Sequence, residues 1–396
     1  MLGGMAKLFN ILKTLLVLLI IKQQLLATDM ENLTAKDTFI IITKHITILL
    51  LICLVFIVTG CSKKRVSSVY DISVHSIGSA ITADSIFINK RIIHFKESSN
   101  NPKGVFSRIS RLFIRENRMI IFDNKAQRVI TYDTTGKFIS SFDVYGRGPS
   151  ESLQISDIYV ESTNSIYLYS DTPTKIMKTD SLGNVLKELF LEKSYLDFSI
   201  PDTGKESFVF INIPSSPQYI SKVVSDTIVS NHLHNEDSNN NEYIPGHFIT
   251  TGNNQLISRR FDNNIYLYRG DTIISYCSIW FDEGFIHLDR IKKRRKNQGL
   301  LFEECIKHNK VFMITNAQTI AEYLIFNTNL PFFTVVNLNN LHSISINRIE
   351  EQECKFPINA FNRILIEGDT PRIGFTYDDG KDDSRIIMYD LKKDIL

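Results

Sequence analysis

Short apolar runs, each closed by a polar turn, are the dominant pattern along the chain. The clearest example is the stretch 118–160, where three such runs end in Asp123, Asp133 and Asp143. Apolar and β-branched residues fill the runs, and Asp-Asn or Thr-Thr-Gly sequences separate them, which predicts adjacent β-strands joined by tight turns. A single sheet of this kind cannot bury its own faces, so it needs neighbouring sheets.

The run that begins at Arg118 recurs along the chain. Similar runs begin at Ser165, Ser207, Asn264, Glu322 and Arg372, at offsets of 47, 42, 57, 58 and 50 residues. A second strand follows most of them and a further strand precedes each, which gives about four strands per unit at a period near that of propeller blades. The sequence therefore predicts an all-β fold, a six-bladed β-propeller with four-stranded antiparallel blades. A pair of β-sandwiches is the alternative, and six similar units at a near-constant period argue against it.

The first two units also resemble a known family. The matching residues are Phe122–Asp123, Ile130–Asp133, Gly136–Lys137, Tyr145–Glu151 and Ile155–Asp157. In these residues the chain resembles the six-bladed β-propeller lipoproteins of anaerobic Gram-negative bacteria, which are similar to NHL-repeat proteins. That family's loop usually reads G-x-G-P-G-E, and this chain has Ser150 where Gly is common. The resemblance implies the propeller fold and a place in the cell envelope, and it implies no particular activity.

An apolar run near the N-terminus predicts export. Ile46–Val58 follows Lys44 and is 13 residues long. This is short for a membrane-spanning helix, which needs about 20 residues, and it suits the apolar core of a secretory signal. The run leads into Thr59-Gly60-Cys61, which resembles a bacterial lipobox and implies cleavage after Gly60 and lipidation of Cys61. A signal anchor with a chance cysteine is the alternative.

These features divide the chain into a signal segment (1–60), a lipidated tether (61–80) and the propeller (81–396). Met30 begins a compact signal peptide, so the true start is either Met30 or an earlier Met that adds a membrane segment at Phe9–Ile21. Lys63 to Arg65 follow the cysteine without an acidic residue. Because acidic residues there resemble the surface-export signal of such lipoproteins, we expect lipid anchoring at the periplasmic face of the outer membrane.

Composition and motif content limit the partners and the reactions that we expect of the chain. A formal net charge of +2 gives no reason to expect nucleic acid as a partner. The five cysteines have no C-x₂₋₄-C spacing, so we expect no zinc site, and one disulfide among Cys277, Cys305 and Cys354 is open in an oxidising compartment. The chain has no G-x-S-x-G, H-E-x-x-H or phosphate-loop motif, so we expect no cofactor and no motif-encoded catalytic residue.

Three residues are candidates for ligand contacts in the channel or at its rim. Arg147 and Glu151 lie in the Gly- and Pro-containing loop between the first two units, where they either meet a ligand or pair with the neighbouring backbone. Asp157 follows on a predicted inner strand and can face the channel. Asp157, Asn316 and Glu367 all lie near predicted inner strands and could contribute to a calcium site, but their spacing forms no distinctive constellation, and solvated channel residues are the simpler interpretation.

Two other clusters have simpler interpretations. His232 and His234 could form a metal pair on one strand face, but the run 235–242 that follows is loop-like, which favours a flexible insertion. The basic run Lys292–Lys296 lies in an insertion at about 289–308 that could be helical. A solvated face is the default there, with a contact to anionic lipid headgroups as the alternative.

Two functions fit these observations. The first is a lipid-anchored binding or scaffold module for a glycan, a peptide or an envelope protein. The second is a lactonase or lyase with a site in the central channel. Carboxylates, or His with Arg, meeting at the channel centre would favour the enzyme, and an aromatic or apolar patch on one rim would favour the binding module. Because no catalytic set is visible in the sequence, we favour the binding module.

The sequence also makes two structural predictions. Little chain remains after residues 385–390 to complete the last blade, so the segment 85–95 should pair beside them and close the ring. Gly136 lies in a Thr-Thr-Gly-Lys hairpin turn and should have a positive φ, so that Gly136→Val costs on the order of 1 kcal/mol or more.

Overall fold

The computed structural model describes part of the chain in detail. The described residues are 69–75, 78–95, 104–201, 207–213, 215–234, 248–250, 255–269, 271–287, 298–351, 354, 357–359, 362–368, 372–378 and 384–393. All of them lie in the second of two units, residues 66–396. Gly60, Cys61 and the whole signal segment lie outside the described residues, as does the basic run Lys292–Lys296.

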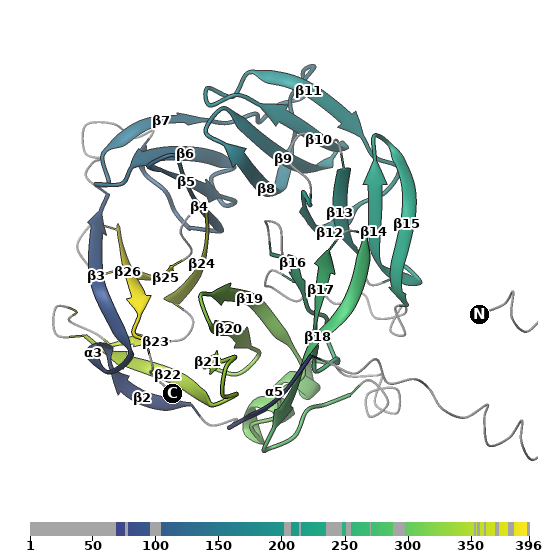
Figure 1. Cartoon of the computed structure of the whole chain (residues 1–396). Helices are drawn as coiled ribbons and strands as arrows, with labels where there is room; N and C mark the ends of the chain where they lie inside the picture. Colours follow the sequence, from purple (N-terminus) through teal and green to yellow (C-terminus); the bar gives the residue numbers. More distant parts are fainter. Residues whose placement is uncertain are drawn as a thin grey trace, which may run out of the picture. The chain divides into compact units, whose positions relative to one another are not determined.

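Six blades surround a central axis in the described part of the second unit (Figure 1). From the axis outward, the first three contain β4 (Arg111–Arg115), β5 (Arg118–Asp123), β6 (Arg128–Asp133) and β7 (Phe138–Phe142) in blade 1; β8 (Gln154–Ser162), β9 (Ser165–Thr172), β10 (Thr174–Thr179) and β11 (Val185–Phe190) in blade 2; and β12 (Tyr195–Ser199), β13 (Ser207–Asn212), β14 (Gln218–Val224) and β15 (Thr227–His234) in blade 3.

The second half of the ring is built in the same way. It contains β16 (Gln255–Ile257), β17 (Asn264–Arg269) and β18 (Thr272–Phe281) in blade 4; β19 (Ile314–Ile320), β20 (Tyr323–Thr328), β21 (Phe333–Asn337), β22 (Ser343–Glu350) and the short β23 (Ile358–Asn359) in blade 5; and β24 (Arg363–Gly368), β25 (Ile373–Asp378) and β26 (Ser384–Leu391) in blade 6. The inner strands β24 and β4 pair in parallel, so blades 6 and 1 share one continuous sheet.

The repeated apolar run is the second strand of every blade. The six runs found in the sequence are β5, β9, β13, β17, β20 and β25, so the predicted period is confirmed. Most of these strands read as nearly continuous apolar segments because neighbouring blades bury both of their faces, whereas β17 is buried only at Ile265 and Tyr268. In β13, for example, all six residues are buried.

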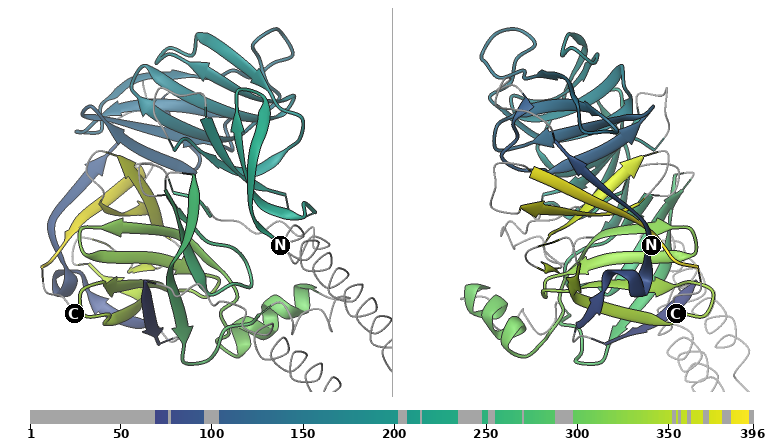
Figure 2. Two further views of the ribbon diagram at one scale, coloured as in Figure 1. Left: turned by 45° about the vertical axis from the view of Figure 1, so that its right-hand side comes forward. Right: turned by 90° about the vertical axis from the view of Figure 1, so that its left-hand side faces the viewer.

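The N-terminal part of the described chain runs around the outside of three blades. β1 (Tyr70–Val74) pairs in parallel with β18, β2 (Ser79–Thr82) pairs in parallel with β22, and β3 (Phe87–His94) pairs antiparallel with β26. Two views agree on this course (Figure 2). We call these three strands the N-terminal strap.

The strap confirms the predicted closure and extends it. Residues 385–390 pair with β3 as expected, with Arg385 opposite His94 and Asp390 opposite Ile88. β1 and β2 also belong to the sheets, so strand pairing in the described part of the chain begins at Tyr70. Each strap strand covers an edge that would otherwise present unpaired backbone groups.

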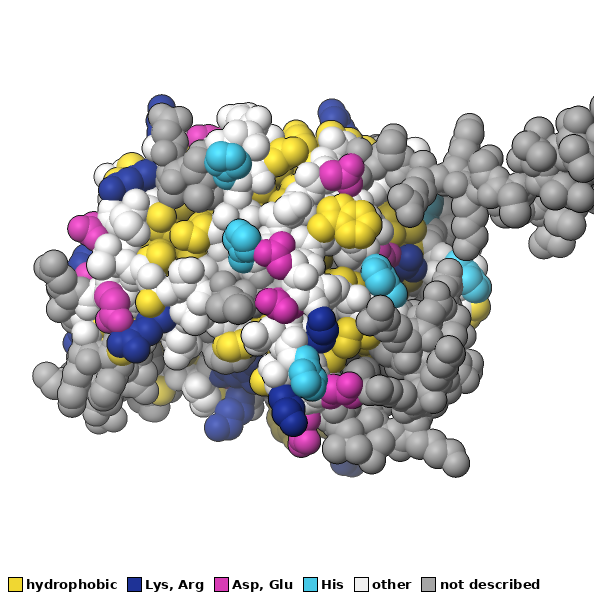
Figure 3. All heavy atoms as spheres, turned by 90° about the horizontal axis from the view of Figure 1, so that it is seen from below, with side chains coloured by type: hydrophobic (Ala, Val, Ile, Leu, Met, Phe, Trp, Pro, Cys, Tyr) yellow, Lys and Arg dark blue, Asp and Glu magenta, His cyan; other side chains and the backbone are white. Residues whose placement is uncertain are grey.

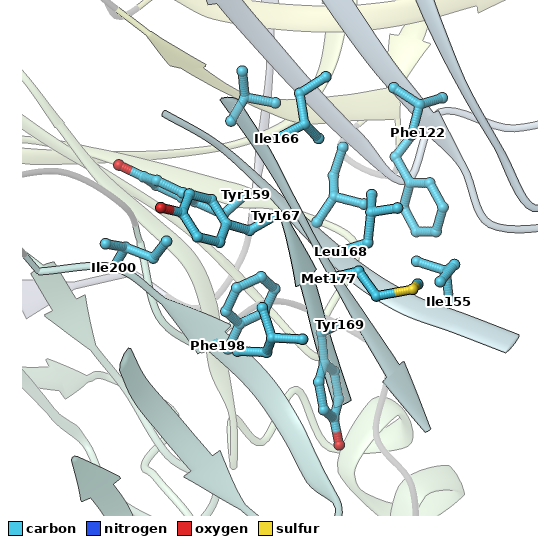
Figure 4. Packing of buried hydrophobic residues seen from close by; sticks show 14 of the residues in the cluster. Phe122, Ile155, Tyr159, Ile166, Tyr167, Leu168, Tyr169, Met177, Phe198 and Ile200 are labelled. Atoms are coloured by element: carbon cyan, nitrogen blue, oxygen red, sulfur yellow. The ribbon is translucent and has the colours of Figure 1, made fainter. Parts of the chain in front are cut away.

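The blades pack through large apolar side chains. The cluster between blades 1, 2 and 3 includes Phe122, Tyr159, Leu168 and Phe198, and Figure 4 shows them interleaving between adjacent sheets. A fully buried aromatic or Leu side chain contributes about 1.5–3 kcal/mol of transfer free energy, so these clusters fix the angle between blades.

Two hairpin turns repeat the same local chemistry. Asp133 Oδ1 accepts the backbone N–H groups of Thr135 and Lys137, and Asp180 Oδ1 accepts those of Leu182 and Asn184. The side-chain hydrogen bond from Thr135 is the largest influence that lowers the pKa of Asp133. Gly136 has φ +88°, which confirms the predicted positive angle.

The remaining described elements are short. The insertion predicted to be helical contains α5 (Gln298–Lys307), and α3 (Ala83–Ile86) lies within the strap. Within the described residues no helix is long and apolar enough to cross a membrane. Cys277, Cys305 and Cys354 are not joined to one another by a disulfide.

Candidate functional site

One arginine lies between two carboxylates on the inner strands. The Nε of Arg111 on β4 is 3.4 Å from Oδ1 of Asp157 on β8, and its Nη2 is 3.2 Å from Oε1 of Glu367 on β24. All three side chains are buried. Burial disfavours the charged guanidinium, but the carboxylates of Asp157 and Glu367 outweigh this effect and raise the pKa of Arg111. The group therefore stays charged and joins blades 6, 1 and 2.

Further polar contacts link successive inner strands. Gln318 on β19 donates to the carbonyl of Ile366 on β24 at 2.8 Å, and Gln255 on β16 donates to Oγ of Ser199 on β12 at 2.7 Å. Ser258, just after β16, donates to the carbonyl of Ile314 on β19 at 2.8 Å. These contacts join blades 5 and 6, 3 and 4, and 4 and 5. Together with Arg111 they form a polar clasp around the axis, which we call the axial clasp.

A second buried arginine is less well paired. Arg363 on β24 donates through Nη1 to the carbonyl of Asn316 at 3.1 Å and to Oδ1 of Asn327. Within the described residues its Nε and Nη2 have no hydrogen-bond partner. Burial lowers the pKa of Arg363 to about 9. Through these two hydrogen bonds, Arg363 holds the start of β24 against blade 5.

The three residues considered for a calcium site, Asp157, Asn316 and Glu367, do not form an oxygen cage in the structure. The Arg111 guanidinium stands between Asp157 and Glu367, and the carbonyl of Asn316 accepts from Arg363. In the described part of the chain, no group of three His, Cys, Asp or Glu side chains is placed to hold a metal ion.

The loop between blades 1 and 2 is ordered by its own side chains. Oε2 of Glu151 accepts the N–H of Gly148 at 2.5 Å, and the N–H of Ser152 donates to the carbonyl of Val144 at 2.8 Å. The side chain of Glu151 therefore points back into the loop and pairs with its backbone, which is the second of the two roles considered for it in the sequence analysis. Arg147 is exposed at the tip of the loop.

Ser150 occupies a backbone position that suits glycine. Its φ is +61°, in the left-handed region that strains most L-residues. This explains why the resembling family commonly has Gly at that place in the loop.

We expect Ser150→Gly to raise the free energy of unfolding by about 0.5–1 kcal/mol, because Gly adopts this angle without strain. Chemical denaturation of the purified propeller measures the change. Ser150→Ala is the matched control, since Ala removes the hydroxyl but keeps the strained backbone. An equal gain from both variants would contradict the backbone explanation.

Two exposed aromatic side chains belong to this loop and to the strand that the loop contacts. Tyr145 is 62% exposed in the loop, and Phe190 is 61% exposed at the end of β11. The loop reaches β11 through Ser150, whose Oγ lies 3.4 Å from Oε2 of Glu188. We call Tyr145, Arg147 and Phe190 the blade 2 rim.

A buried lysine supports the blade 2 rim from below. Lys175 pairs with Glu188 and lies 5.6 Å from the centre of the Phe190 ring. Sequence reasoning identified Arg147 but missed Tyr145 and Phe190. Phe190 closes a run, Val185–Phe190, that alternates too weakly to show which side chains face solvent.

The histidine pair is placed on β15. His232 and His234 are two residues apart, but Leu233 between them has φ +53°, so the regular alternation of the strand is interrupted. Nε2 of His232 lies 3.0 Å from Oγ of Ser230, and burial lowers the pKa of His232. The loop-like run after His234 lies outside the described residues.

Comparison with known proteins agrees with six blades. Residues 72–369 match the family described as 6-bladed beta-propeller (DUF5128). A solved Bacteroides fragilis protein with an exported-protein designation superposes with a TM-score of 0.63 at 15% identity, over 82% of this chain and 99% of its own. At this identity the likeness shows the fold alone. No curated protein sequence matches the chain significantly.

Two further solved structures are less similar. A DUF4221 member from Bacteroides vulgatus has a TM-score of 0.44 at 9% identity, over 77% of this chain and 97% of its own. A catalytically inactive virginiamycin B lyase from Staphylococcus aureus, bound to quinupristin, has a TM-score of 0.42 at 12% identity, over 82% of this chain and 96% of its own.

Proposed function

Because the chain belongs to the 6-bladed beta-propeller family, we propose that it is a lipid-anchored binding module of the cell envelope. It presents the blade 2 rim to a glycan, a peptide or an envelope protein. The observation that carries this proposal is the exposure of Tyr145 and Arg147 in the loop and of Phe190 on β11, the strand that the loop contacts, in a region where the supporting side chains are already paired.

The blade 2 rim has the composition of a recognition surface. Tyr and Arg are among the residues that most often dominate binding energy at interfaces, because they offer large contact areas and directional hydrogen bonds. The loop beneath them is held by the hydrogen bond from Gly148 to Glu151 and by the contact between Ser150 and Glu188. A rim that is ordered before binding loses little conformational entropy when a ligand arrives.

We expect Phe190→Ala and Tyr145→Ala each to weaken ligand binding by about tenfold or more, the scale of a moderate interface hot spot. Arrays of envelope glycans and peptides, read with the purified propeller, first identify a ligand, and its affinity for each variant is then measured. Ile139→Ala is the matched control, because Ile139 is an exposed apolar side chain on β7 of blade 1. Unchanged affinity in both aromatic variants would move the binding site away from this rim.

The anchor is proposed from the sequence. Cys61 follows a short apolar run and small residues, and the first described strand begins at Tyr70, so only a short tether separates the modified residue from the fold. A diacylglycerol and an N-linked acyl chain on one cysteine give stable anchoring, since more than one chain is needed for it. The periplasmic face of the outer membrane is the proposed location.

We expect metabolic labelling with a fatty-acid analogue to mark the wild-type protein and to be lost in Cys61→Ala. Cys53→Ala is the matched control, because Cys53 also lies near the N-terminus but within the apolar run. Equal labelling of wild type and Cys61→Ala, or a mature N-terminus upstream of Cys61, would establish the signal-anchor alternative.

A lactonase or lyase with its site on the axis is the second candidate. The meeting of Arg111 with Asp157 and Glu367 favours it, since carboxylates and an arginine do converge on the inner strands. The same contacts weaken it, because each carboxylate is buried and already paired with the guanidinium. Turnover of a bound ligand would favour this second function if Asp157→Asn abolished the turnover and kept the affinity for the ligand.

A further inference from the structure

A buried arginine between blades 5 and 6 keeps one edge of its guanidinium unpaired. Arg363 begins β24, which is the neighbour of β19 among the inner strands (Figure 1). Its Nη1 donates to the carbonyl of Asn316 on β19 at 3.1 Å and to Oδ1 of Asn327 on β20. Its Nε and Nη2 are buried and have no hydrogen-bond partner among the described residues. Both acceptors of Nη1 are neutral, so they bind the guanidinium without compensating its charge.

The sheet face that carries Arg363 is apolar. Strand pairing places Arg363 opposite Phe375 of β25, and Phe375 opposite Ile387 of β26. Residues that stand opposite each other in a ladder share one face of the sheet, so these three side chains lie in one row. Phe375 and Ile387 belong to the apolar cluster of blades 5 and 6, where the rings of Phe375 and Phe333 lie 5.7 Å apart between centroids. The guanidinium therefore lies at the border of an apolar interface.

Arg111 shows how the same fold compensates a buried guanidinium. Burial disfavours the charge of Arg111, but the carboxylates of Asp157 and Glu367 lie beside it and raise its pKa. Arg363 has no such support from the described residues, and burial lowers its pKa to about 9. At neutral pH the group is still protonated, so it carries a buried positive charge without a described counter-ion.

Basic side chains on the surface are in a different situation. The space-filling view from below shows Lys and Arg side chains at the outside of the described surface, with Asp and Glu side chains among them (Figure 3). Water and salt screen charges in such positions. The side chain of Arg363 lies in a residue that is only 5% exposed, so solvent gives little compensation. Because an unpaired buried ion is strongly unfavourable, an anion that reaches Arg363 stabilises the folded protein.

We propose that Arg363 binds a small monovalent anion of the carboxylate type, such as formate or bicarbonate, between blades 5 and 6. Nε and Nη2 lie on the same edge of the planar guanidinium and donate side by side, which matches the two oxygens of one carboxylate. The anion supplies the charge that Asp157 and Glu367 supply to Arg111. Burial of Arg363 favours a free small ion over the carboxylate of a larger ligand. The site is independent of the blade 2 rim and of the lipid anchor.

Thermal unfolding of the purified full-length protein tests this site. Sodium formate replaces sodium glucuronate stepwise at constant ionic strength, so that the carboxylate group is kept and only the size of the anion changes. An anion that binds the folded state alone raises the midpoint temperature with the logarithm of its concentration once it exceeds the dissociation constant. For a domain of this size, we expect a rise of about 2 °C for each tenfold increase in formate. Circular dichroism measures the midpoint.

Two arginine variants separate the site from a general effect of the salt. Arg363→Gln removes the charge and the paired donors, and we expect it to lose the dependence on formate. Arg147→Gln is the matched control at an exposed arginine and should keep the full dependence. An equal dependence in wild type and Arg363→Gln would show that formate acts through the solvent and would overturn the site. A flat response of the wild type, or a midpoint that falls as formate replaces glucuronate, would also overturn it.

Arg363→Lys keeps the proposal open to test if Arg363→Gln does not fold. Lys retains the positive charge but offers a single ammonium group in place of two parallel donors. We expect the folded Arg363→Lys protein to need about tenfold more formate than wild type for the same rise in midpoint temperature. An unchanged formate dependence in Arg363→Lys would overturn the assignment of Nε and Nη2 as the binding edge.

Discussion

Replacing Arg111 with Met should lower the free energy of unfolding by about 3–5 kcal/mol, the range measured when one partner of a buried ion pair is removed. The change leaves the carboxylates of Asp157 and Glu367 buried without their guanidinium. Met fills much of the volume of the Arg side chain, so the effect reports charge and not a cavity. Urea denaturation followed by far-UV circular dichroism gives the free energy.

Removing the stranded charges should recover much of this loss. We expect Arg111→Met combined with Asp157→Asn and Glu367→Gln to be markedly more stable than Arg111→Met alone, because the amides are cheaper to bury than carboxylates. Arg147→Met is the matched control at an exposed arginine and should change stability little. A triple variant as unstable as the single one would show that packing, and not charge, explains the role of Arg111.

Gly136→Val should destabilise the propeller by about 3 kcal/mol or more. About 1–2 kcal/mol comes from forcing a Cβ-bearing residue into the left-handed region at φ +88°. A further 1–3 kcal/mol, the approximate scale of overpacking, comes from overlap of the new Cβ with the carbonyl oxygen of His94. His94 ends β3, so the turn of blade 1 packs directly on the strap that closes blade 6.

Gly284→Val separates the two contributions. Gly284 has the same φ of +88°, but a Cβ there meets only the flexible end of Lys310 at 3.6 Å. Its substitution should therefore cost only the backbone part, about 1–2 kcal/mol. Similar losses at both positions would mean that the backbone near His94 moves aside and that the contact between blades 1 and 6 is soft.

The sequence predicted the parts of the fold that are encoded locally. In most blades the second strand is buried on both faces, so its apolar run survives the insertions between blades and keeps the period visible. The closing role of 85–95 also followed, because the last blade lacked chain for an outer strand. β1 and β2 were missed, since they are short, partly exposed strands whose partners lie in blades 4 and 5 and leave no local signature.

The axial clasp illustrates the same limit at the level of side chains. Asp157 and Glu367 were both named as inner-strand carboxylates, and the structure brings them to a common partner. Arg111 was missed because it opens a strand, where a basic residue ordinarily marks the solvated end of an apolar run. Which charges meet depends on the closure of the ring, which no local pattern records. The same holds for the blade 2 rim, where Tyr145 lies in the loop between blades 1 and 2 and Phe190 ends β11.

The N-terminal strap fixes the order in which the molecule can fold. Its residues leave the ribosome first, yet their partners β18, β22 and β26 are made late, and the pair formed by His75 and Asp282 spans 207 positions. Contacts between such distant residues carry a large loop-closure entropy and slow the search for the native state. Until those partners are made, the strap strands themselves are unpaired and open to pairing between chains. Ring closure is therefore the final step of folding, and the interval before it is when this chain is most exposed to misassembly.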